Sequence, residues 1–451
     1  MKTILVVGGG PAGLYAAQKL ALTGHQVIIL NRDIKPGGLA EYGIYPLKHK
    51  MKDGLRKQFA KILGLPNVHY FGHVPVGAHC PISIEDLRQF NPTALVFAVG
   101  AQGTKRLDLP GEDAGGVYSA KDFVYHYNRL PPFASRDFST GKRIAIVGMG
   151  NVMVDIARWL LQDDPERKTE EVIVVARRGP FEAKFDEKEF AHIEMHLDRP
   201  AFHEELERVR ERLQAVGQDI AKVPATTFPT LAKPSQELVR PRLLFRFLSS
   251  PQAIHADTSG RIARLTLTEN QLVLRDGGTA AKATDKTVEL DVDTMIFAIG
   301  DVVDPALGLP CGPGGYITNP DPGDAQKAPY QVFDPQNGKV LEGAFVVGWA
   351  RKASEGLVGI ARRDAELGAT QVLKYVDMIE ERQAASAEEI GAYLARRGLQ
   401  AITKADLPYL AQAEERQARE RGLLFFKFAD DAGMLSAVER EKCEACSPAL
   451  A

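Results

Sequence analysis

Two segments of the chain repeat one pattern: an apolar strand, a glycine-rich turn, a helix and a second apolar strand. The first covers residues 3–30 and carries Gly-Gly-Gly-Pro-Ala-Gly at residues 8–13. The second covers residues 143–176 and carries Gly-Met-Gly-Asn-Val-Met at residues 148–153. The first fits G-x-G-x-x-G, and the second is a looser match with Met153 where the third glycine would be. In this motif the glycines let the backbone approach a pyrophosphate, and the helix N-terminus faces the phosphates. The chain is therefore expected to bind two dinucleotides, one in each of two Rossmann-like α/β domains.

The composition is that of an ordinary globular protein. The 451 residues include 45% hydrophobic and 25% charged residues, with a formal net charge of −2, which excludes a disordered chain and gives no long-range attraction to nucleic acid. No apolar run approaches about 18 residues, so no membrane span is expected. The first eight residues read as a strand rather than a signal peptide. With only four cysteines, we expect a cytoplasmic protein with reduced thiols.

Further apolar runs that end in glycine predict buried parallel strands at residues 94–100, 294–300 and 343–348. A helix is expected from just after residue 356 to residue 379, and more helices between residues 384 and 439. The charged run at residues 204–212 predicts a solvated helix face, and the Pro/Gly-rich stretch at residues 304–323 predicts a loop between domains.

The residues after the second strand of each repeat distinguish the two sites. The position that usually carries an acid for the ribose hydroxyls is Asn31 in the first repeat, followed by Arg32, which alone leaves the nucleotide ambiguous. In the second repeat Arg177 and Arg178 stand where a 2′-phosphate would lie, and arginine pairs bidentately with phosphate. We therefore assign NADPH to the second site. By elimination the first site holds the other dinucleotide, for which FAD is the usual companion.

Short stretches spread over residues 3–422 carry a family resemblance. They are Gly38-Leu39 with Tyr42-Gly43-Ile44, Gly150-Asn151-Val152 with residues 155–158, residues 177–180 with Lys188-Glu189, residues 247–252, Gly348-Trp349 with Gly356, and residues 394–398. Together they resemble the adrenodoxin reductase branch of the flavin-dependent ferredoxin–NADP reductases. The resemblance implies a glutathione-reductase-type flavoprotein architecture. Residues 1–105 and 332–451 would form a discontinuous FAD-binding domain with a helical C-terminal part, and residues 106–331 the NADP-binding domain.

The resemblance also implies the site residues. FAD would be bound by Gly8, Gly10, Pro11, Ala12, Gly13, Asn31, Gly38, Leu39, Val74, Gly100, Ala101, Gly348, Trp349, Gly356, Leu357 and Val358. NADP would be bound by Met149, Gly150, Asn151, Val152, Arg177, Arg178, Glu189 and Gly356. Neither a metal nor a catalytic side chain is expected, because the cofactors carry hydride transfer.

The implied activity is that of a FAD-dependent NADPH oxidoreductase that passes electrons from NADPH through FAD to a small iron–sulfur protein such as ferredoxin. Arg246 matches one of two arginines that dock ferredoxin in the family, whereas the other position is Ser249. Arg240 and Arg242 could compensate. The chain also departs from the family at Asn31 and at residues 353–355, and these changes leave the electron acceptor open.

Two alternatives remain at this stage. One is an NADPH-oxidising electron-input subunit of a larger complex, because residues 37–46 are similar to the small subunit of glutamate synthase. The other is a non-catalytic flavin- or NADPH-binding protein, as Asn31 and the altered turn would allow. Dithiol mechanisms lack the cysteine pairs they need, and Cys443 and Cys446 are interpreted as an inert tail. The oligomeric state and the downstream pathway do not follow from the sequence.

Overall fold

The chain forms two compact units. The computed structural model describes residues 1–234, 237–320, 329–353 and 358–446. Unit 1 comprises residues 1–104, 125–135 and 300–451, and unit 2 comprises residues 105–124 and 136–299. Residues 125–135 and 300–331, assigned to the NADP-binding domain above, cluster with unit 1. Which nucleotide each unit binds stays a prediction.

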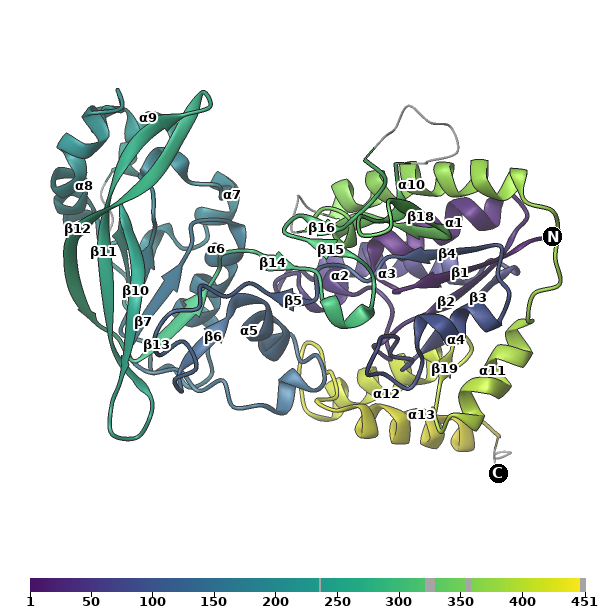
Figure 1. Ribbon diagram of the computed structural model, residues 1–451. Coiled ribbons are helices and arrows are strands. Elements are labelled where there is room, and N and C mark those ends of the chain that lie inside the picture. Colours follow the sequence, from purple (N-terminus) through teal and green to yellow (C-terminus); the bar gives the residue numbers. More distant parts are fainter. Residues whose placement is uncertain (235–236, 321–328, 354–357, 447–451) are drawn as a thin grey trace. The chain divides into compact units, whose positions relative to one another are not determined.

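Unit 1 is built on a mainly parallel sheet with the strand order β17-β18-β4-β1-β2-β3-β19 (Figure 1). The central strand β1 pairs in parallel with β2 on one side and β4 on the other, so the direction of winding reverses there and a ligand is expected at the carboxyl end of β1. All five residues of β1 are buried. The strands are β1 (Thr3–Val7), β2 (Gln26–Leu30), β3 (Val68–Gly72), β4 (Ala94–Phe97), β17 (Gln331–Asp334), β18 (Lys339–Val346) and β19 (Ile402–Thr403).

Helices cover both faces of this sheet. The first helix, α1, packs against α10, and both bury apolar residues against one face of the sheet. The helices are α1 (Pro11–Leu22), α2 (Leu39–Tyr42), α3 (His49–Leu63), α4 (Ile84–Gln89), α10 (Val358–Met378), α11 (Ala387–Arg396), α12 (Leu407–Glu420) and α13 (Asp431–Cys446). Short strands add two pairs, β5 (Gly103–Thr104) with β14 (Asp301–Val302) and β15 (Cys311–Gly312) with β16 (Gly315–Tyr316).

Unit 2 repeats this plan with a five-stranded parallel sheet of order β6-β13-β7-β8-β9 and adds an antiparallel sheet β10-β11-β12. Its strands are β6 (Val117–Ser119), β7 (Arg143–Val147), β8 (Glu171–Val175), β9 (Arg242–Arg246), β10 (Ser249–Ala256), β11 (Ile262–Arg275), β12 (Gly278–Asp291) and β13 (Thr294–Phe297). Its helices are α6 (Asn151–Arg158), α7 (Glu187–Phe190), α8 (Arg199–Gln214) and α9 (Val223–Thr226), and α5 (Ala120–Tyr127) crosses the boundary between the units in sequence.

The structure confirms the predicted fold class, two Rossmann-like α/β units. The predicted strands at residues 94–100 and 294–300 are present as β4 and β13, and the helix expected up to residue 379 is α10. The second repeat predicts a helix that continues through Leu161, whereas residues 159–163 form a π-helical turn after α6. The short strand β19 within the C-terminal helical region was not foreseen. Among the described residues, no helix combines the length and apolar character that crossing a membrane requires.

The prediction of a solvated face for residues 204–212 was wrong for part of that run. In α8 the side chain of Glu205 is only 8% exposed, and Arg208 and Arg212 are 24% and 22% exposed. Apolar residues of the same helix, Leu206 and Val209, are buried. The charged side chains that face inward neutralise one another in ion pairs, which is what allows them to be buried.

Candidate functional site

The turn after β1 can form only with glycine at two positions. Gly8 has φ +106°, and a Cβ there would lie 2.5 Å from the carbonyl oxygen of Ala98. A Cβ on Gly13 would lie 1.9 Å from the carbonyl oxygen of Gly8, so helix α1 approaches the turn closely. Gly10 is the N-cap and supplies no side-chain cap. The first N–H groups of α1 therefore remain able to bind a phosphate.

Two further backbone segments of unit 1 lie against this turn. The Gly37 N–H donates to the carbonyl of Gly9 at 2.7 Å, and a Cβ on Gly38 would lie 3.2 Å from the Cα of Gly10. From the other end of the chain, a Cβ on Gly348 would lie 2.5 Å from the Cβ of Ala12. The folded chain thus gathers glycines from three distant segments around the start of α1, leaving room for a ligand backbone at close range.

Asn31 follows β2 and is 6% exposed. Its Oδ1 accepts from the Gly9 N–H at 2.7 Å, and its Nδ2 donates to the carbonyls of Asp33 and Lys35 and to the Tyr70 hydroxyl at 2.7, 3.1 and 3.0 Å. These bonds commit both amide hydrogens and one Oδ1 lone pair, so one lone pair remains to accept from a ribose hydroxyl. The Asn31 amide ties the end of β2 to the glycine turn.

A cavity of about 330 Å³ lies beside the end of β2. Arg32, Asp33, Tyr42, His73 and Phe133 are among its lining residues. It is at the carboxyl ends of β2 and β3, the edge of a doubly wound sheet at which nucleotides bind. Val74, predicted to contact FAD, follows β3 and is 1% exposed.

The late glycine-tryptophan motif is held by a carboxylate from α10. The Gly348 N–H donates to Oδ2 of Asp364 at 2.6 Å, and the guanidinium of Arg351 pairs with Oδ1 of the same carboxylate. Arg351 also stacks over the Tyr330 ring at 4.3 Å. These contacts fix the short 3₁₀ turn that contains Trp349, a half-buried residue.

The remaining predicted FAD residues are accounted for as follows. Val358 is the first residue of α10, Pro11 is the first residue of α1, and Leu39 begins α2 next to Gly38. Gly100 and Ala101 follow β4 after the carbonyl of Ala98 that faces Gly8, and Ala101 is buried. Gly356 and Leu357 lie outside the described residues.

A buried carboxylate, Glu41, lies on the short helix that begins at Leu39. Glu41, on α2, is 3% exposed and pairs with Lys427 at 2.8 Å, Arg56 at 2.7 Å and Lys35 at 3.6 Å. Burial alone would raise its pKa, but Lys35, Lys427 and Arg56 hold the pKa of Glu41 well below its usual range. These ion pairs tie α2, which carries the predicted FAD residue Leu39, to α3 and to the C-terminal part of the chain.

Two buried lysines belong to the same region. Lys52 is 4% exposed and donates to Oδ1 of Asn128 at 2.8 Å. Burial, and secondly the charge of Lys427, lower the pKa of Lys52 to about 7. Burial lowers the pKa of Lys427 to about 8 against the pull of Glu41. Unit 1 therefore contains amines that change charge near neutral pH.

The turn after β7 in unit 2 has the same construction. Gly148 has φ +122°, and a Cβ there would lie 2.2 Å from the carbonyl oxygen of Ala298, while a Cβ on Gly150 would meet nothing within 4 Å. Gly150 is the N-cap of α6 and, like Gly10, supplies no side-chain cap. Val152 on the first turn of α6 is 48% exposed. This turn also presents free N–H groups and open space to a phosphate.

A second loop lies beside this turn. The Lys184 N–H donates to the carbonyl of Met149 at 2.9 Å, and the Asp186 N–H donates to Oδ1 of Asn151 at 2.7 Å. Glu189 follows on α7 and is half-buried. The fold therefore brings the predicted NADP residues of α6 and α7 together.

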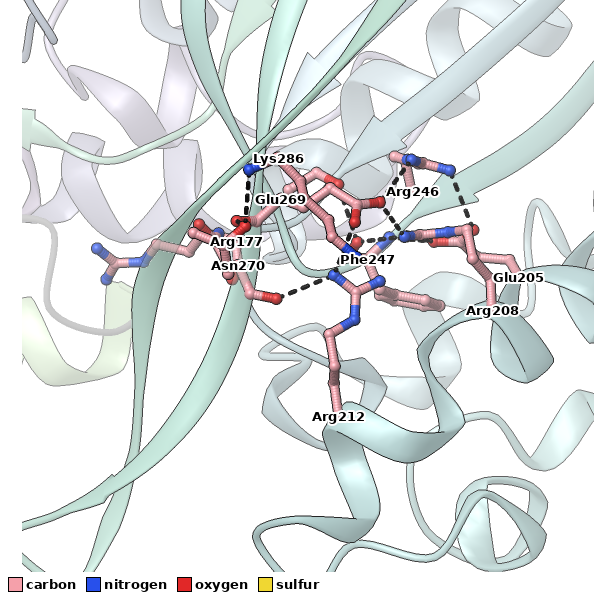
Figure 2. A network of polar contacts seen from close by, with 11 residues as sticks. Arg177, Glu205, Arg208, Arg212, Arg246, Phe247, Glu269, Asn270 and Lys286 are labelled. Carbon is pink, nitrogen blue, oxygen red and sulfur yellow. Dashed lines mark hydrogen bonds and ion pairs between the residues drawn. The ribbon is translucent and has the colours of Figure 1, made fainter.

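The two arginines after β8 differ in their contacts. Arg178 donates from Nη1 to the carbonyl of Thr279 at 3.4 Å. Arg177 is exposed, and among the described residues its guanidinium makes no hydrogen bond or ion pair. In Figure 2 the Arg177 side chain lies at the edge of a polar network rather than within it. An exposed, unpaired guanidinium of this kind can receive a phosphate without first losing another partner.

Two of the three arginines predicted to dock a protein partner are already paired. Arg246 is 21% exposed and contacts Glu269 at 3.2 Å and Glu205 at 3.8 Å, and Arg242 pairs with Glu171 and, at 3.1 Å, with Asp198. Arg240 is exposed. Of the three, Arg240 has the charge most available to an acidic partner.

Sequence reasoning missed the residues that hold these sites in shape. The carboxylate of Asp364 holds Gly348 from α10, and the buried amide of Asn270 contacts the carbonyl of Arg177 at 2.9 Å. No local pattern points to either pairing. The spacing of Glu205, Arg208 and Arg212 at i, i+3 and i+7 does place three charges on one helix face, a signal that could have suggested an ion cluster.

Comparison with known proteins agrees with this geometry. The family model of pyridine nucleotide-disulphide oxidoreductases matches residues 2–201. The chain is 30% identical to NADPH-ferredoxin reductase FprA of Mycobacterium leprae over 93% of this chain and 94% of that protein. It is 28% identical to the mitochondrial NADPH:adrenodoxin oxidoreductase of Salvelinus fontinalis over 96% of this chain and 90% of that protein. The solved structure of Mycobacterium tuberculosis FprA in complex with NADPH superimposes with a TM-score of 0.79 at 28% identity, covering 97% of this chain and 99% of that one.

Proposed function

Because the chain belongs to the adrenodoxin reductase-like family of ferredoxin–NADP reductases, we propose that unit 1 binds FAD, that unit 2 binds NADPH, and that electrons pass from NADPH through FAD to a small iron–sulfur protein. The observation that carries the nucleotide assignment is the pair of strand ends. Arg177 after β8 is exposed and unpaired among the described residues, whereas Asn31 after β2 is buried and hydrogen-bonded. The first suits an added phosphate and the second does not.

The residues present fit both dinucleotides. A Cβ on Gly13 would lie 1.9 Å, and one on Gly348 2.5 Å, from a neighbouring atom, so neither position has space for a side chain. The uncapped starts of α1 and α6 offer N–H groups at the two turns where pyrophosphates are expected. In our proposal Gly8, Gly10 and Gly38 surround the FAD pyrophosphate, and Gly150 and Asn151 contact the NADPH pyrophosphate. Trp349 would contact the flavin, and Asp364 and Arg351 hold its turn.

The bound FAD supplies the conversion of a two-electron hydride donor into single-electron transfers. The protein's own contribution is positioning. The helix N-termini bind and orient the phosphates, the Asp364 carboxylate holds the Gly348 N–H at 2.6 Å, and Arg177 and Arg178 select the 2′-phosphate. No acid, base or nucleophile is required of these side chains.

An anaerobic absorbance titration of the purified protein tests this function. We expect a yellow protein whose flavin absorbance is lost on addition of NADPH, and at much higher concentrations on addition of NADH. The reduced protein should then reduce an added ferredoxin, and Arg240→Ala should raise the ferredoxin KM at low salt. A protein whose bound flavin stays oxidised with NADPH contradicts the proposal and favours a non-catalytic binding protein. Co-purification of a large partner favours the electron-input alternative.

A further inference from the structure

The loop that carries Arg177 and Arg178 is held by its backbone from one side of unit 2. Three successive carbonyls accept hydrogen bonds there. The Ala176 carbonyl accepts from the Ser249 N–H at 3.0 Å, and the Arg178 carbonyl accepts from the Leu248 N–H at 3.2 Å. Between them, the Arg177 carbonyl accepts from Nδ2 of Asn270 at 2.9 Å. Asn270 is thus the one side chain among these three donors.

Asn270 is itself fixed from several directions. It is 2% exposed and lies on β11, next to an irregularity in the pairing with β12 between Thr268 and Asn270. Its backbone N–H donates to the Leu248 carbonyl at 2.7 Å, and the second hydrogen of its amide bonds to Oγ of Ser250 at 2.8 Å. A buried amide with both hydrogens engaged has one orientation available.

An ion cluster from α8 supports Asn270 from behind, and Figure 2 shows Asn270 between Arg177 and Arg212. Arg212 donates to the backbone carbonyl of Asn270 at 3.0 Å and to the neighbouring Glu269 carboxylate at 3.4 Å. Arg208 pairs with the same carboxylate at 2.8 Å. Because these contacts converge on residues 269 and 270, the position of the Asn270 amide is set by packed elements rather than by the loop it holds.

The same side of unit 2 supports the loop a second time, near the start of β12. The Thr279 carbonyl accepts from the Arg178 guanidinium, and the Thr279 hydroxyl donates to Oε1 of Glu182 at 2.6 Å. The other oxygen of Glu182 accepts from the Gly179 N–H at 2.9 Å. The β11–β12 hairpin therefore contacts the arginine loop at both of its ends.

From this arrangement we propose that Asn270 is a positioning residue for the discrimination between NADPH and NADH. It acts through the Arg177 carbonyl, and the inference rests on the proposed function because it takes the Arg177–Arg178 pair as the 2′-phosphate site. An arginine on a loop binds the 2′-phosphate most tightly when the loop backbone is already ordered. If the loop must become ordered on binding, the entropy lost in ordering it weakens the binding of the nucleotide. Asn270 removes part of that cost for the loop and touches no reacting atom.

The test compares Asn270→Ala with Ser250→Ala. The first removes the bond to Arg177. The second removes only the other partner of the same amide and leaves the bond to Arg177 in place. For Asn270→Ala we expect the dissociation constant of 2′,5′-ADP and the KM for NADPH to rise about fivefold to tenfold, as loss of one buried hydrogen bond allows. The constants for 5′-AMP and NADH, and kcat, should change less than about twofold, and Ser250→Ala should leave all of them within the same limit.

Binding of 2′,5′-ADP and 5′-AMP is measured by calorimetry on the flavin-loaded protein, so that the readout does not depend on turnover. Should Asn270→Ala not fold, Asn270→Ser, which keeps a polar group but is too short to reach the Arg177 carbonyl, replaces it with the same expected split. An equal loss for both nucleotides, or no change for 2′,5′-ADP, overturns the proposal.

The double variant Arg177→Ala, Arg178→Ala separates this inference from the function beneath it. If that variant loses NADPH selectively while Asn270→Ala does not, the role of Asn270 is refuted and the proposed function stands. If the double variant binds 2′,5′-ADP as tightly as the unmodified protein, the assignment of the nucleotide fails and the inference fails with it.

Discussion

The two glycine turns of this chain are near copies, but the residues at the ends of the neighbouring strands are used in opposite ways. After β2, Asn31 is 6% exposed and directs its amide inward to Gly9 and Tyr70. After β8, Arg177 is exposed, and its contact with the protein is made by its backbone carbonyl, to Asn270. If the proposed nucleotide assignment holds, one motif serves two dinucleotides in different ways: one strand end stabilises the turn itself, and the other presents a charge to the ligand.

The turns differ in one further respect, at the third glycine of the motif. The position is Gly13 in unit 1 and Met153 in unit 2, and Met153 is fully buried. Helix α1 approaches its turn so closely that a Cβ would lie 1.9 Å from the Gly8 carbonyl. Unit 2 carries a complete side chain at the same position of α6, so it tolerates what unit 1 excludes.

The largest expected effect follows from this difference. Gly13→Ala should destabilise unit 1 by more than about 4 kcal/mol, because backbone atoms rather than a flexible side chain must move. The protein should purify with little or no flavin, as measured by the ratio of absorbance at 450 nm to that at 280 nm, on the order of a tenth of the unmodified value. The matched change Met153→Ala should cost about 2–3 kcal/mol through a cavity and leave the flavin bound. A flavin-replete Gly13→Ala protein would show that α1 can retreat and that the two turns are equivalent.

The second effect sharpens the contrast between the strand ends. Replacement of both Arg177 and Arg178 by alanine should raise the KM for NADPH about 100-fold, since each guanidinium contributes a charge-assisted hydrogen bond of about 1.5–3 kcal/mol to a phosphate. The KM for NADH should stay within about threefold. The thermal stability should fall only slightly, because the Arg177 guanidinium has no partner among the described residues and Arg178 loses only one long hydrogen bond, 3.4 Å to the Thr279 carbonyl. Steady-state kinetics with both nucleotides, and a melting curve, check this. Equal losses for NADPH and NADH would mean that the arginines bind something other than the 2′-phosphate.

The third effect concerns Asn31 at the end of β2, where the substitution should change stability rather than nucleotide preference. Asn31→Ala should reduce the unfolding free energy of unit 1 by about 2 kcal/mol, because the Gly9 N–H and the Tyr70 hydroxyl lose a buried partner. Flavin binding should weaken only as far as the turn loosens, and the preference for NADPH should not change. Urea unfolding followed by fluorescence measures the stability, and flavin release measures the affinity. If stability is retained and FAD affinity falls more than tenfold, Asn31 contacts the ribose directly, as the acid of the family would.

The sequence predicts features that depend on neighbouring residues better than features that depend on residues far apart in the chain. The turns, the strands next to them and the identity of the residues at the strand ends are local, and the glycine spacing and the apolar runs predict them. The contacts of Asn270 with Arg177 and of Asp364 with Gly348 join residues 93 and 16 positions apart. The first depends on the register of a long hairpin. The burial of Glu205 likewise depends on a distant partner, because its Oε1 accepts from the Phe247 N–H at 2.6 Å, 42 positions along the chain.

The smallest expected effect concerns the charges buried behind each site, which differ in chemistry. The cluster around α8 in unit 2 is made of arginine and glutamate, whereas the region behind α2 in unit 1 contains Lys52 and Lys427. The pKa of Lys52 is lowered by burial to about 7, against about 10.4 in an unfolded chain. Between these values the unfolded state binds more protons than the folded state, so stability rises with pH. Below about pH 7 the amine is charged in both states and its burial cost is constant.

Unit 1 should therefore gain about 1–2 kcal/mol of stability between pH 7 and pH 9 through Lys52, and Lys52→Met should remove most of that gain. Lys427 remains in the Lys52→Met variant. Because its pKa is lowered to about 8, the stability of that variant should still rise between pH 7 and pH 9, but by less. Trp159 lies in unit 2 and Trp349 in unit 1, so fluorescence in a Trp159→Phe background reports urea unfolding of unit 1 alone. The matched change Arg212→Met should lower the stability of unit 2 equally at both pH values, because an arginine stays charged throughout this range. If Lys52→Met instead costs the same at pH 7 and pH 9, the amine is charged in the folded protein at both, and the two buried clusters do not differ in their titration.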